Sequence, residues 1–178
     1  MTLPSLILPK KPGSSHTVVL LLGGNLDNRE ALLNEALRLL ESEVGPCIGA
    51  SLLYESEPWG FPDKVHPFLN RVIVLQTLLS AQEVLEVALL VEIRLGRNRE
   101  VEEGLYASRK LDVDILFYDD SQISTPSLTI PHPRMASRMF VLVPLAELMP
   151  RECHPVLGVT MEELLLACSD TLWVRRYR

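Results

Sequence analysis

The stretch Arg109-Lys110-Leu111-Asp112-Val113-Asp114-Ile115-Leu116-Phe117-Tyr118 shows the two-residue alternation of a β-strand. Its hydrophobic face consists of Leu111, Val113, Ile115 and Phe117. Asp112 and Asp114 therefore share the opposite face, with carboxylates roughly 7 Å apart. Two carboxylates held this way repel each other, and Mg²⁺ prefers such oxygen ligands. The pair predicts a metal site, and Arg109 beside it predicts an accompanying polyphosphate. A solvated edge strand with two exposed acids is the alternative.

The pattern on either side of this strand predicts an alternation of strands and helices. We expect strands at residues 17–22, 51–57, 68–78 and 109–118, and helices at 28–41 and 81–95. Asn25 or Asp27 would cap the first helix, Gly23-Gly24 would end the first strand, and Ser80 would cap the second helix. Short strands at 123–130, helical turns at 134–138 and 140–148, and a helix at 161–168 follow. The order predicts an α+β fold of the ferredoxin-like βαββαβ type, an antiparallel sheet with helices packed on one face and a helical C-terminal tail.

The composition indicates one globular domain. Of 178 residues, 47% are hydrophobic and 22% charged, and we expect a flexible leader over residues 1–16 before a single domain over 17–178. The net charge of −6 argues against broad binding to nucleic acid, which requires a basic surface. No hydrophobic run reaches the length of a membrane span. Three cysteines without paired spacing predict reduced thiols and a cytoplasmic protein.

Arginines gather around the polar segment 96–108. The four are Arg94, Arg97, Arg99 and Arg109. They indicate a local anion site, because a guanidinium group is planar and permanently charged. Cations at a helix end and in a solvated loop are the alternative. Glu92, near the end of the second helix, would face the metal or pair with Arg94 or Arg97.

Three further side chains have chemistry suited to a ligand. His132 lies between Pro131 and Pro133, and this rigid backbone suits contact with a phosphate, although a histidine in a loop is more often structural. Phe68 can stack on a polar heterocycle and Asn70 can read its edge, with ordinary strand packing as the alternative. Gly23-Gly24-Asn25 matches neither phosphate-loop pattern, and no nucleophile triad has supporting spacing.

In this order the motifs resemble the 6-hydroxymethyl-7,8-dihydropterin pyrophosphokinase family, over nearly the whole chain from Thr17 onward. The matching motifs are Leu22-Gly23-Gly24-Asn25-Leu26, Tyr54 with Ser56 and Pro58, Phe68-Leu69-Asn70, Glu92 with Gly96-Arg97-Asn98-Arg99, the stretch from Arg109 to Ile115, and Pro131-His132-Pro133-Arg134 with Arg138 and Phe140. The resemblance implies transfer of pyrophosphate from ATP to the hydroxymethyl group of the pterin, with release of AMP, in folate biosynthesis. It also implies two Mg²⁺ ions.

The resemblance assigns a role to each candidate. Asp112 and Asp114 would hold both metal ions and, with Arg97 and Arg109, form the catalytic group. The ATP site would comprise Glu92, Arg97, Arg109, His132 and Arg138, and the pterin site Ser56, Trp59, Phe68, Asn70 and Phe140. Arg99 and Tyr106 would belong to a loop that closes over the reactants. We expect a cytoplasmic monomer that binds ATP and the pterin, and neither nucleic acid nor membrane.

The chain also departs from the family pattern. Tyr106-Ala107-Ser108 stands where the family usually has Trp-Gly-Pro, Pro133 replaces a tyrosine, and Trp59 replaces a smaller residue. The loop is about two residues longer than a common form and carries Glu100, Glu102 and Glu103. These changes leave open a catalytically lapsed protein that binds ATP or the pterin without turnover. A ferredoxin-like RNA-binding module is a further alternative, but the strands lack its aromatic signature.

Overall fold

The computed structural model describes residues 15–61, 65–97 and 108–178. Its elements, in chain order, are β1 (His16–Gly24), α1 (Arg29–Glu43), β2 (Cys47–Ala50), β3 (Tyr54–Ser56), β4 (Phe68–Thr77), α2 (Ala81–Arg94), β5 (Asp112–Tyr118), β6 (Ile123–Ser124), β7 (Thr129–Ile130), the 3₁₀ turn η1 (Met135–Ser137), α3 (Met139–Leu148), α4 (Met161–Ala167) and β8 (Val174–Arg176). The main sheet is antiparallel, with the order β5-β1-β4-β3-β8 and β2 also paired to β4. The predicted α+β fold with an antiparallel sheet is confirmed.

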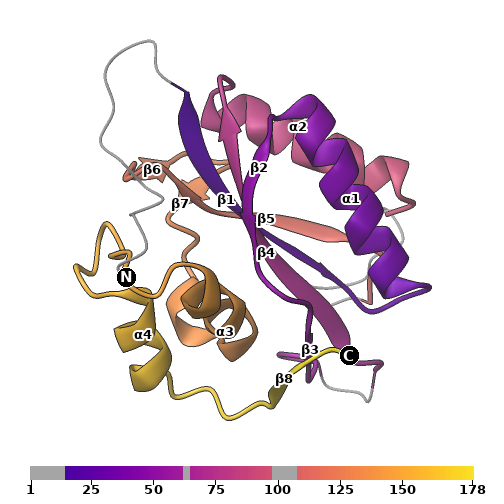
Figure 1. Ribbon diagram of the computed structural model, residues 1–178, viewed down its shortest axis with the longest axis vertical. Helices are drawn as coiled ribbons and strands as arrows, with labels where there is room; N and C mark the ends of the chain where they lie inside the picture. The colour runs from indigo at the N-terminus through magenta and orange to yellow at the C-terminus, as the bar shows by residue number, and fades with distance from the viewer. Residues whose placement is uncertain (1–14, 62–64, 98–107) are drawn as a thin grey trace.

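Helices cover both faces of the sheet (Figure 1). The central strand β1 has hydrophobic side chains on both faces. Val18, Leu20 and Leu22 pack into the core beneath α1 and α2. Val19 and Leu21 pack into a second core with α3 and α4. The sequence predicted helices on one face, and it did not predict that the C-terminal tail covers the other. The unbroken hydrophobic run of β1 is typical of a strand buried on both faces.

The predicted strand over 51–57 was wrong in extent, because only β3 lies within it and β2 precedes it, and the end of β1 and the start of α1 also differ from the prediction. The first strand continues through Gly23 and Gly24, because a residue without a side chain lets another backbone approach: a Cβ at Gly24 would lie 2.3 Å from the carbonyl oxygen of Lys110. The cap of α1 is Asn28, whose side chain accepts from the N–H of Ala31, and neither Asn25 nor Asp27. Ser80 caps α2 as predicted, in a capping box with Glu83.

The strand β5 contains a bulge that the sequence pattern does not reveal. Val19 of β1 pairs with Phe117 while the next residue, Leu20, pairs with Ile115, so Leu116 is an extra residue. Phe117 therefore packs into the core of α3 and α4, and its predicted place on the face of Leu111 was wrong. The edge strand β8 was also not predicted. In the described part of the chain, no helix is long and apolar enough to span a membrane.

Candidate active site

The floor of the site is a row of three residues across the sheet. Gly23 of β1 pairs with Asn70 of β4 on one side and with Asp112 of β5 on the other. Residues paired in this way direct their side chains to the same face, and Gly23 has none. The row is therefore hollow between the amide and the carboxylate. A cavity of about 230 Å³ opens there, on the face of the sheet that carries α3.

The cavity brings together residues that are far apart in the chain. The predicted site residues that line it are Ser56, Trp59, Phe68, Asn70, Arg97, Arg109, Asp112, Asp114, His132, Arg138 and Phe140. Leu21, Gly23, Glu57, Phe61 and Arg134 also line it and were not among the predicted site residues. Phe61 lies two residues after Trp59, and Arg134 belongs to the Pro131-His132-Pro133-Arg134 motif, so both residues adjoin predicted site residues in the sequence. Arg99 and Tyr106 lie outside the described residues.

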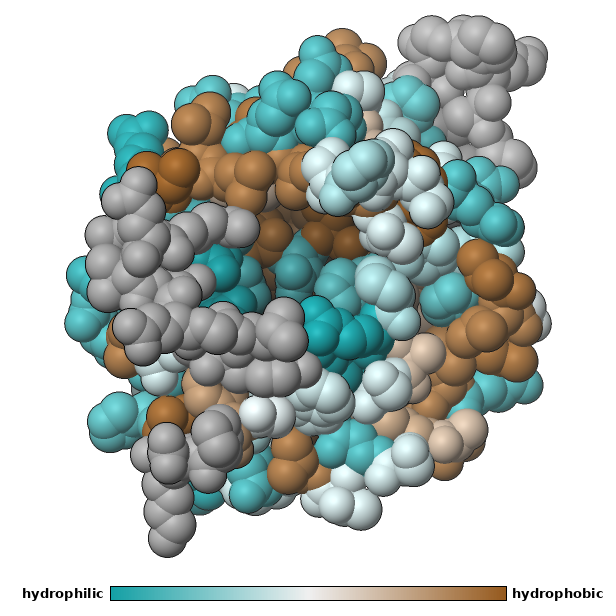
Figure 2. Space-filling view, turned by 180° about the vertical axis from the view of Figure 1, so that it is seen from behind, coloured by the Kyte–Doolittle hydropathy of each residue, from teal (hydrophilic) through white to brown (hydrophobic). Residues whose placement is uncertain are grey.

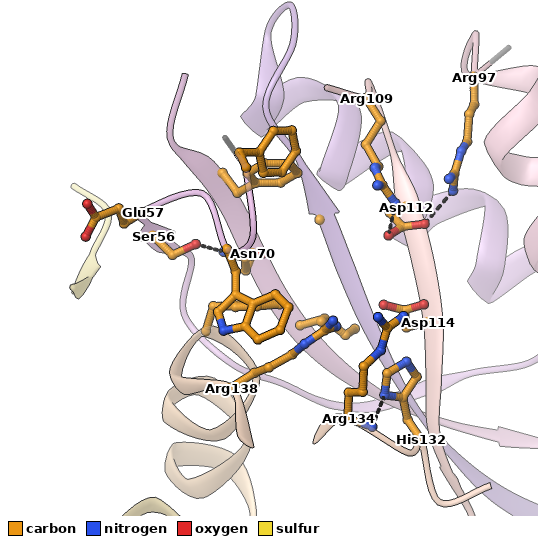
Figure 3. Close-up of a pocket in the computed structure, with 16 residues that line it drawn as sticks. Ser56, Glu57, Asn70, Arg97, Arg109, Asp112, Asp114, His132, Arg134 and Arg138 are labelled. Carbon is orange, nitrogen blue, oxygen red and sulfur yellow. Dashed lines mark hydrogen bonds and ion pairs between the residues drawn. The ribbon is translucent and has the colours of Figure 1, made fainter. Parts of the chain in front are cut away.

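Asp112 accepts hydrogen bonds from two guanidinium groups (Figure 3). Nη1 of Arg97 donates to Oδ1, and Nη1 of Arg109 donates to Oδ2 at 2.7 Å. Two of the four arginines that the sequence assigned to an anion site thus converge on this carboxylate, whereas Arg94 is exposed and Arg99 lies outside the described residues. They supply the neutralising charge that the acidic pair requires where no metal is bound.

Glu92 supports the acidic strand from the opposite face. It is 1% exposed, and its Oε1 lies 3.0 Å from Nη1 of Arg97. The same oxygen accepts from the backbone N–H of Val113 at 2.8 Å. Of the two alternatives for Glu92, pairing with Arg97 is confirmed. Because Val113 lies between the two aspartates, Glu92 also fixes the position of both.

The ionised form of Asp114 is destabilised in the folded protein. Burial, and then the neighbouring carboxylate of Asp112, raise the pKa of Asp114 to about 7. The described residues contain no cluster of three or more metal-binding side chains. Mg²⁺ commonly uses one or two carboxylates and takes its other ligands from water and substrate phosphates. The pair fits that chemistry, since a cation would relieve the repulsion and the burial penalty together.

The position of Arg109 depends on Asn25. The carboxamide oxygen of Asn25 accepts from the N–H of Arg109 at 2.8 Å, and the N–H of Asn25 donates to the carbonyl of Arg109 at 2.9 Å. Nδ2 of Asn25 also donates to Oγ of Ser108 at 3.0 Å. Asn25 is 2% exposed. The residue that resembled a helix cap in the sequence therefore anchors the backbone entering β5.

His132 is neutral and offers a hydrogen-bond donor. Burial, together with the charges of Arg138 and Arg134, lowers the pKa of His132 to about 4. Nδ1 accepts from the N–H of Arg134 at 3.3 Å. The proton of the neutral ring is therefore assigned to Nε2, which can donate to a phosphate oxygen.

Across the cavity, the chemistry changes to amide and aromatic groups. Asn70 is 1% exposed, and its Nδ2 donates to Oγ of Ser56 at 2.8 Å (Figure 3). The guanidinium of Arg138 stacks on the ring of Trp59 at 4.4 Å and lies 5.6 Å from the ring centre of Phe140. A hydrogen-bonding amide beside aromatic rings suits a flat polar heterocycle.

Comparison with known proteins matches residues 19–150 to the family described as 7,8-dihydro-6-hydroxymethylpterin-pyrophosphokinase (HPPK). The chain belongs to this family. It is an enzyme of folate synthesis that transfers a pyrophosphoryl group from ATP to hydroxymethyldihydropterin, as the sequence predicted.

Similar proteins include enzymes named 2-amino-4-hydroxy-6-hydroxymethyldihydropteridine pyrophosphokinase. The one from Porphyromonas gingivalis is 41% identical over 134 residues, which cover 75% of this chain and 90% of that protein. The one from Bacillus subtilis is 41% identical over 128 residues, covering 71% of this chain and 74% of that protein. Among solved structures, Plasmodium falciparum HPPK-DHPS A437G with STZ-DHP has a TM-score of 0.71 at 18% identity. The match covers 88% of this chain and 46% of that one, and supports the fold alone.

The pyrophosphokinase has a second cavity, of about 380 Å³, next to the first. It lies between α2, β5 and the β6–β7 hairpin, and its apolar wall includes Leu85, Leu89, Ile115 and Leu128. Glu92, Asp112, Asp114, His132 and Thr129 also line it. The space-filling view shows a hollow with hydrophobic residues along one wall and hydrophilic residues along another (Figure 2). The sequence did not reveal this cavity, because leucines on a helix resemble ordinary core residues.

Proposed function

We propose that the two adjoining cavities hold the two substrates, with the dihydropterin in the first and the adenosine of ATP in the second. The observation that carries this proposal is that both cavities are lined by Asp112, Asp114 and His132. The first adds an amide and aromatic rings, which suit a pterin. The second adds aliphatic side chains and the hydroxyl group of Thr129, which suit a nucleoside. The triphosphate would then cross the shared acidic and basic residues.

We propose that Asp112 and Asp114 hold two Mg²⁺ ions. The fit is supported by the oxygen-only ligands and by the raised pKa of Asp114. Bound magnesium would supply positive charge to the phosphates and make phosphorus easier to attack. The number of ions follows from the family resemblance. The carboxylate pair carries at most two negative charges, so the phosphates of ATP would supply the rest of the charge that two Mg²⁺ ions require.

The arginines have two tasks in this proposal. Arg97 and Arg109 neutralise Asp112 while no cation is bound. A cation at Asp112 competes with them for its oxygens, so their guanidinium groups become available to phosphates arriving with the metal. His132 would donate from Nε2, and Arg138 would reach the phosphates from the pterin side. Transfer of a phosphoryl-type group depends on such positioning and charge neutralisation more than on covalent chemistry by the protein.

The pterin contacts follow from the first cavity. Asn70 would read the polar edge of the ring, with its amide orientation fixed by Ser56. Phe68 and Phe140 would stack on the ring faces, and Trp59 would close the site beside Arg138. The closing role of Arg99 and Tyr106 stays a prediction.

We also propose a single domain over residues 17–178 that acts as a cytoplasmic monomer. The three cysteines Cys47, Cys153 and Cys168 support this location, because none forms a disulfide.

The deciding experiment measures AMP release from ATP and Mg²⁺, with and without the hydroxymethyldihydropterin. We expect AMP only when the pterin is present. Binding of ATP by calorimetry without any pterin-dependent AMP would instead support the lapsed binding protein. To test the two cavities, Asn70→Ala should weaken pterin binding, and Ile115→Trp should weaken ATP binding. Loss of the same substrate in both variants would contradict the assignment.

A further inference from the structure

The C-terminal residues 170–177, which we call the strap, lie beyond the part of the chain matched to the family. The strap forms strand β8 along the edge of β3, where Val174 pairs with Ser56 and Arg175 with Glu55. The N–H of Glu57 donates to the carbonyl of Trp173 at 3.1 Å, and the N–H of Tyr177 donates to the carbonyl of Leu53 at 2.8 Å. The strap therefore holds the strand that carries Ser56 into the first cavity (Figure 1).

A buried carboxylate secures this contact. Glu55 is 9% exposed, and its Oε2 accepts from Nη2 of Arg175 at 2.5 Å and from Nε at 3.1 Å. Its other oxygen accepts from Arg29 at 2.9 Å, and Arg29 also donates to the carbonyl of Pro67 at 2.7 Å. Pro67 directly precedes Phe68. The network thus connects the strap to both the Ser56 strand and the Phe68 segment of the cavity.

The other end of the strap holds the opposite wall. Oδ2 of Asp170 accepts from the N–H of Met139 at 2.9 Å, and Oδ1 accepts from the N–H of Leu172 at 3.0 Å. Met139 is the first residue of α3 and lies between Arg138 and Phe140. The side chain of Arg138 makes no capping bond at this helix start, so Asp170 supplies the acceptor from outside the helix.

We propose that the strap is a positioning element for the pterin cavity, which sets the spacing between its Ser56 wall and its Arg138–Phe140 wall. This inference rests on the proposed function, because it assigns the first cavity to the pterin. None of the strap contacts described above involves a residue that lines only the second cavity. The strap reaches the nucleotide only through Arg138, so it should affect pterin binding more than nucleotide binding.

The test compares Asp170→Ala and Arg175→Ala with the wild-type chain. We expect each variant to raise both the Kd and the KM for the hydroxymethyldihydropterin by about three- to tenfold, the range expected for one charge-assisted hydrogen bond. The Kd of a non-cleavable ATP analogue with Mg²⁺, and kcat, should stay within about twofold. Arg176→Ala is the matched control, because both arginines are exposed on the same strand and the bonds to Glu55 described above come from Arg175. Asp170→Asn keeps one oxygen, which can still accept from the N–H of Met139, and loses the acceptor for Leu172, so it should restore pterin affinity in part.

The outcomes separate the strap from the proposed function. Pterin and nucleotide affinities that fall in parallel, or a lower melting temperature with unchanged pterin affinity, would overturn the positioning role alone. No pterin binding by the wild-type chain in the presence of Mg²⁺ and the ATP analogue would overturn the proposed function, and the role of the strap with it.

Discussion

Replacing Glu92 should separate two contributions to the stability of the acidic strand. Oε1 of this residue serves both the guanidinium of Arg97 and the N–H of Val113. In Glu92→Ala both partners are lost, whereas in Glu92→Gln the amide oxygen can still accept from Val113. The free energies of unfolding of the two variants should therefore differ by the free-energy cost of one unsatisfied backbone N–H.

The magnitudes follow from burial. Removing one partner of a buried ion pair costs about 3–5 kcal/mol, and the lower end applies because Arg97 keeps Asp112. An orphaned buried N–H adds about 1–3 kcal/mol. Glu92→Gln should therefore lower the free energy of unfolding by about 3 kcal/mol, and Glu92→Ala by about 4–6 kcal/mol. In a domain of this size the alanine variant should melt about 10–15 °C lower than wild type.

Thermal unfolding of the metal-free protein, followed by circular dichroism, measures both values. Glu86→Ala is the control, because Glu86 lies on the same helix and is exposed. We also expect kcat/KM to fall by about a hundredfold in Glu92→Ala, as a displacement of about 1 Å in a catalytic group can do. Equal losses in the two variants would refute the role of the Val113 N–H. Losses below about 1 kcal/mol in both would refute the buried ion pair.

Four further predictions test the site and the fold. Asp112→Asn and Asp114→Asn should both abolish AMP release. Only Asp114→Asn should raise the melting temperature of the metal-free protein, by about 2–4 °C, because it removes a carboxylate whose pKa is raised by burial. Asp112→Asn removes the partner of Arg97 and Arg109 and should not stabilise the protein. Gly23→Ala should raise the KM for the pterin by about tenfold, since a Cβ would lie 3.1 Å from Oδ1 of Asn70, while Gly49→Ala, with ordinary contacts at 3.4 Å, should leave it unchanged. Phe140→Ala should weaken pterin binding by about tenfold and ATP binding much less, and calorimetry showing equal losses would contradict stacking. Between pH 7 and pH 5 the wild-type chain should lose stability relative to His154→Gln, because burial lowers the pKa of His154 and the unfolded chain takes up the proton first; the difference between the two denaturant midpoints measures this contribution.

Local patterns in the sequence predicted local structure well. Alternation placed Asp112 and Asp114 on one face, and the Ser80 cap follows from a pattern within four residues. Features that depend on a distant partner were missed. The bulge at Leu116 exists only in register with β1, and the three residues of β8 are too short for a periodic signal. The docking of α3 and α4 on the second face likewise depends on tertiary packing.

The same difference between local patterns and distant partners holds for the residues of the site. The predicted residues that line the first cavity carry polar or aromatic groups that are unusual where they stand, so a sequence can single them out. The apolar wall of the second cavity is built from Leu85, Leu89 and Ile115, which resemble core residues. The partner of a charged side chain is also invisible in the sequence. Arg97 and Asp112 are 15 residues apart, and only the fold shows that they form an ion pair.

The geometry of the sheet explains why the proposed pterin site and the proposed metal site adjoin in this chain. Neighbouring strands lie about 4.8 Å apart, so Asn70 and Asp112, separated by the Gly23 strand, stand roughly 10 Å apart. A bicyclic heterocycle held at the amide can extend across the missing side chain of Gly23, and its hydroxymethyl arm then points toward the carboxylates. Any side chain at Gly23 would occupy that path. In the proposed arrangement, two strand spacings therefore set the distance from the pterin contact at Asn70 to the metal-binding carboxylate of Asp112, and the C-terminal strap has only to hold the walls on either side.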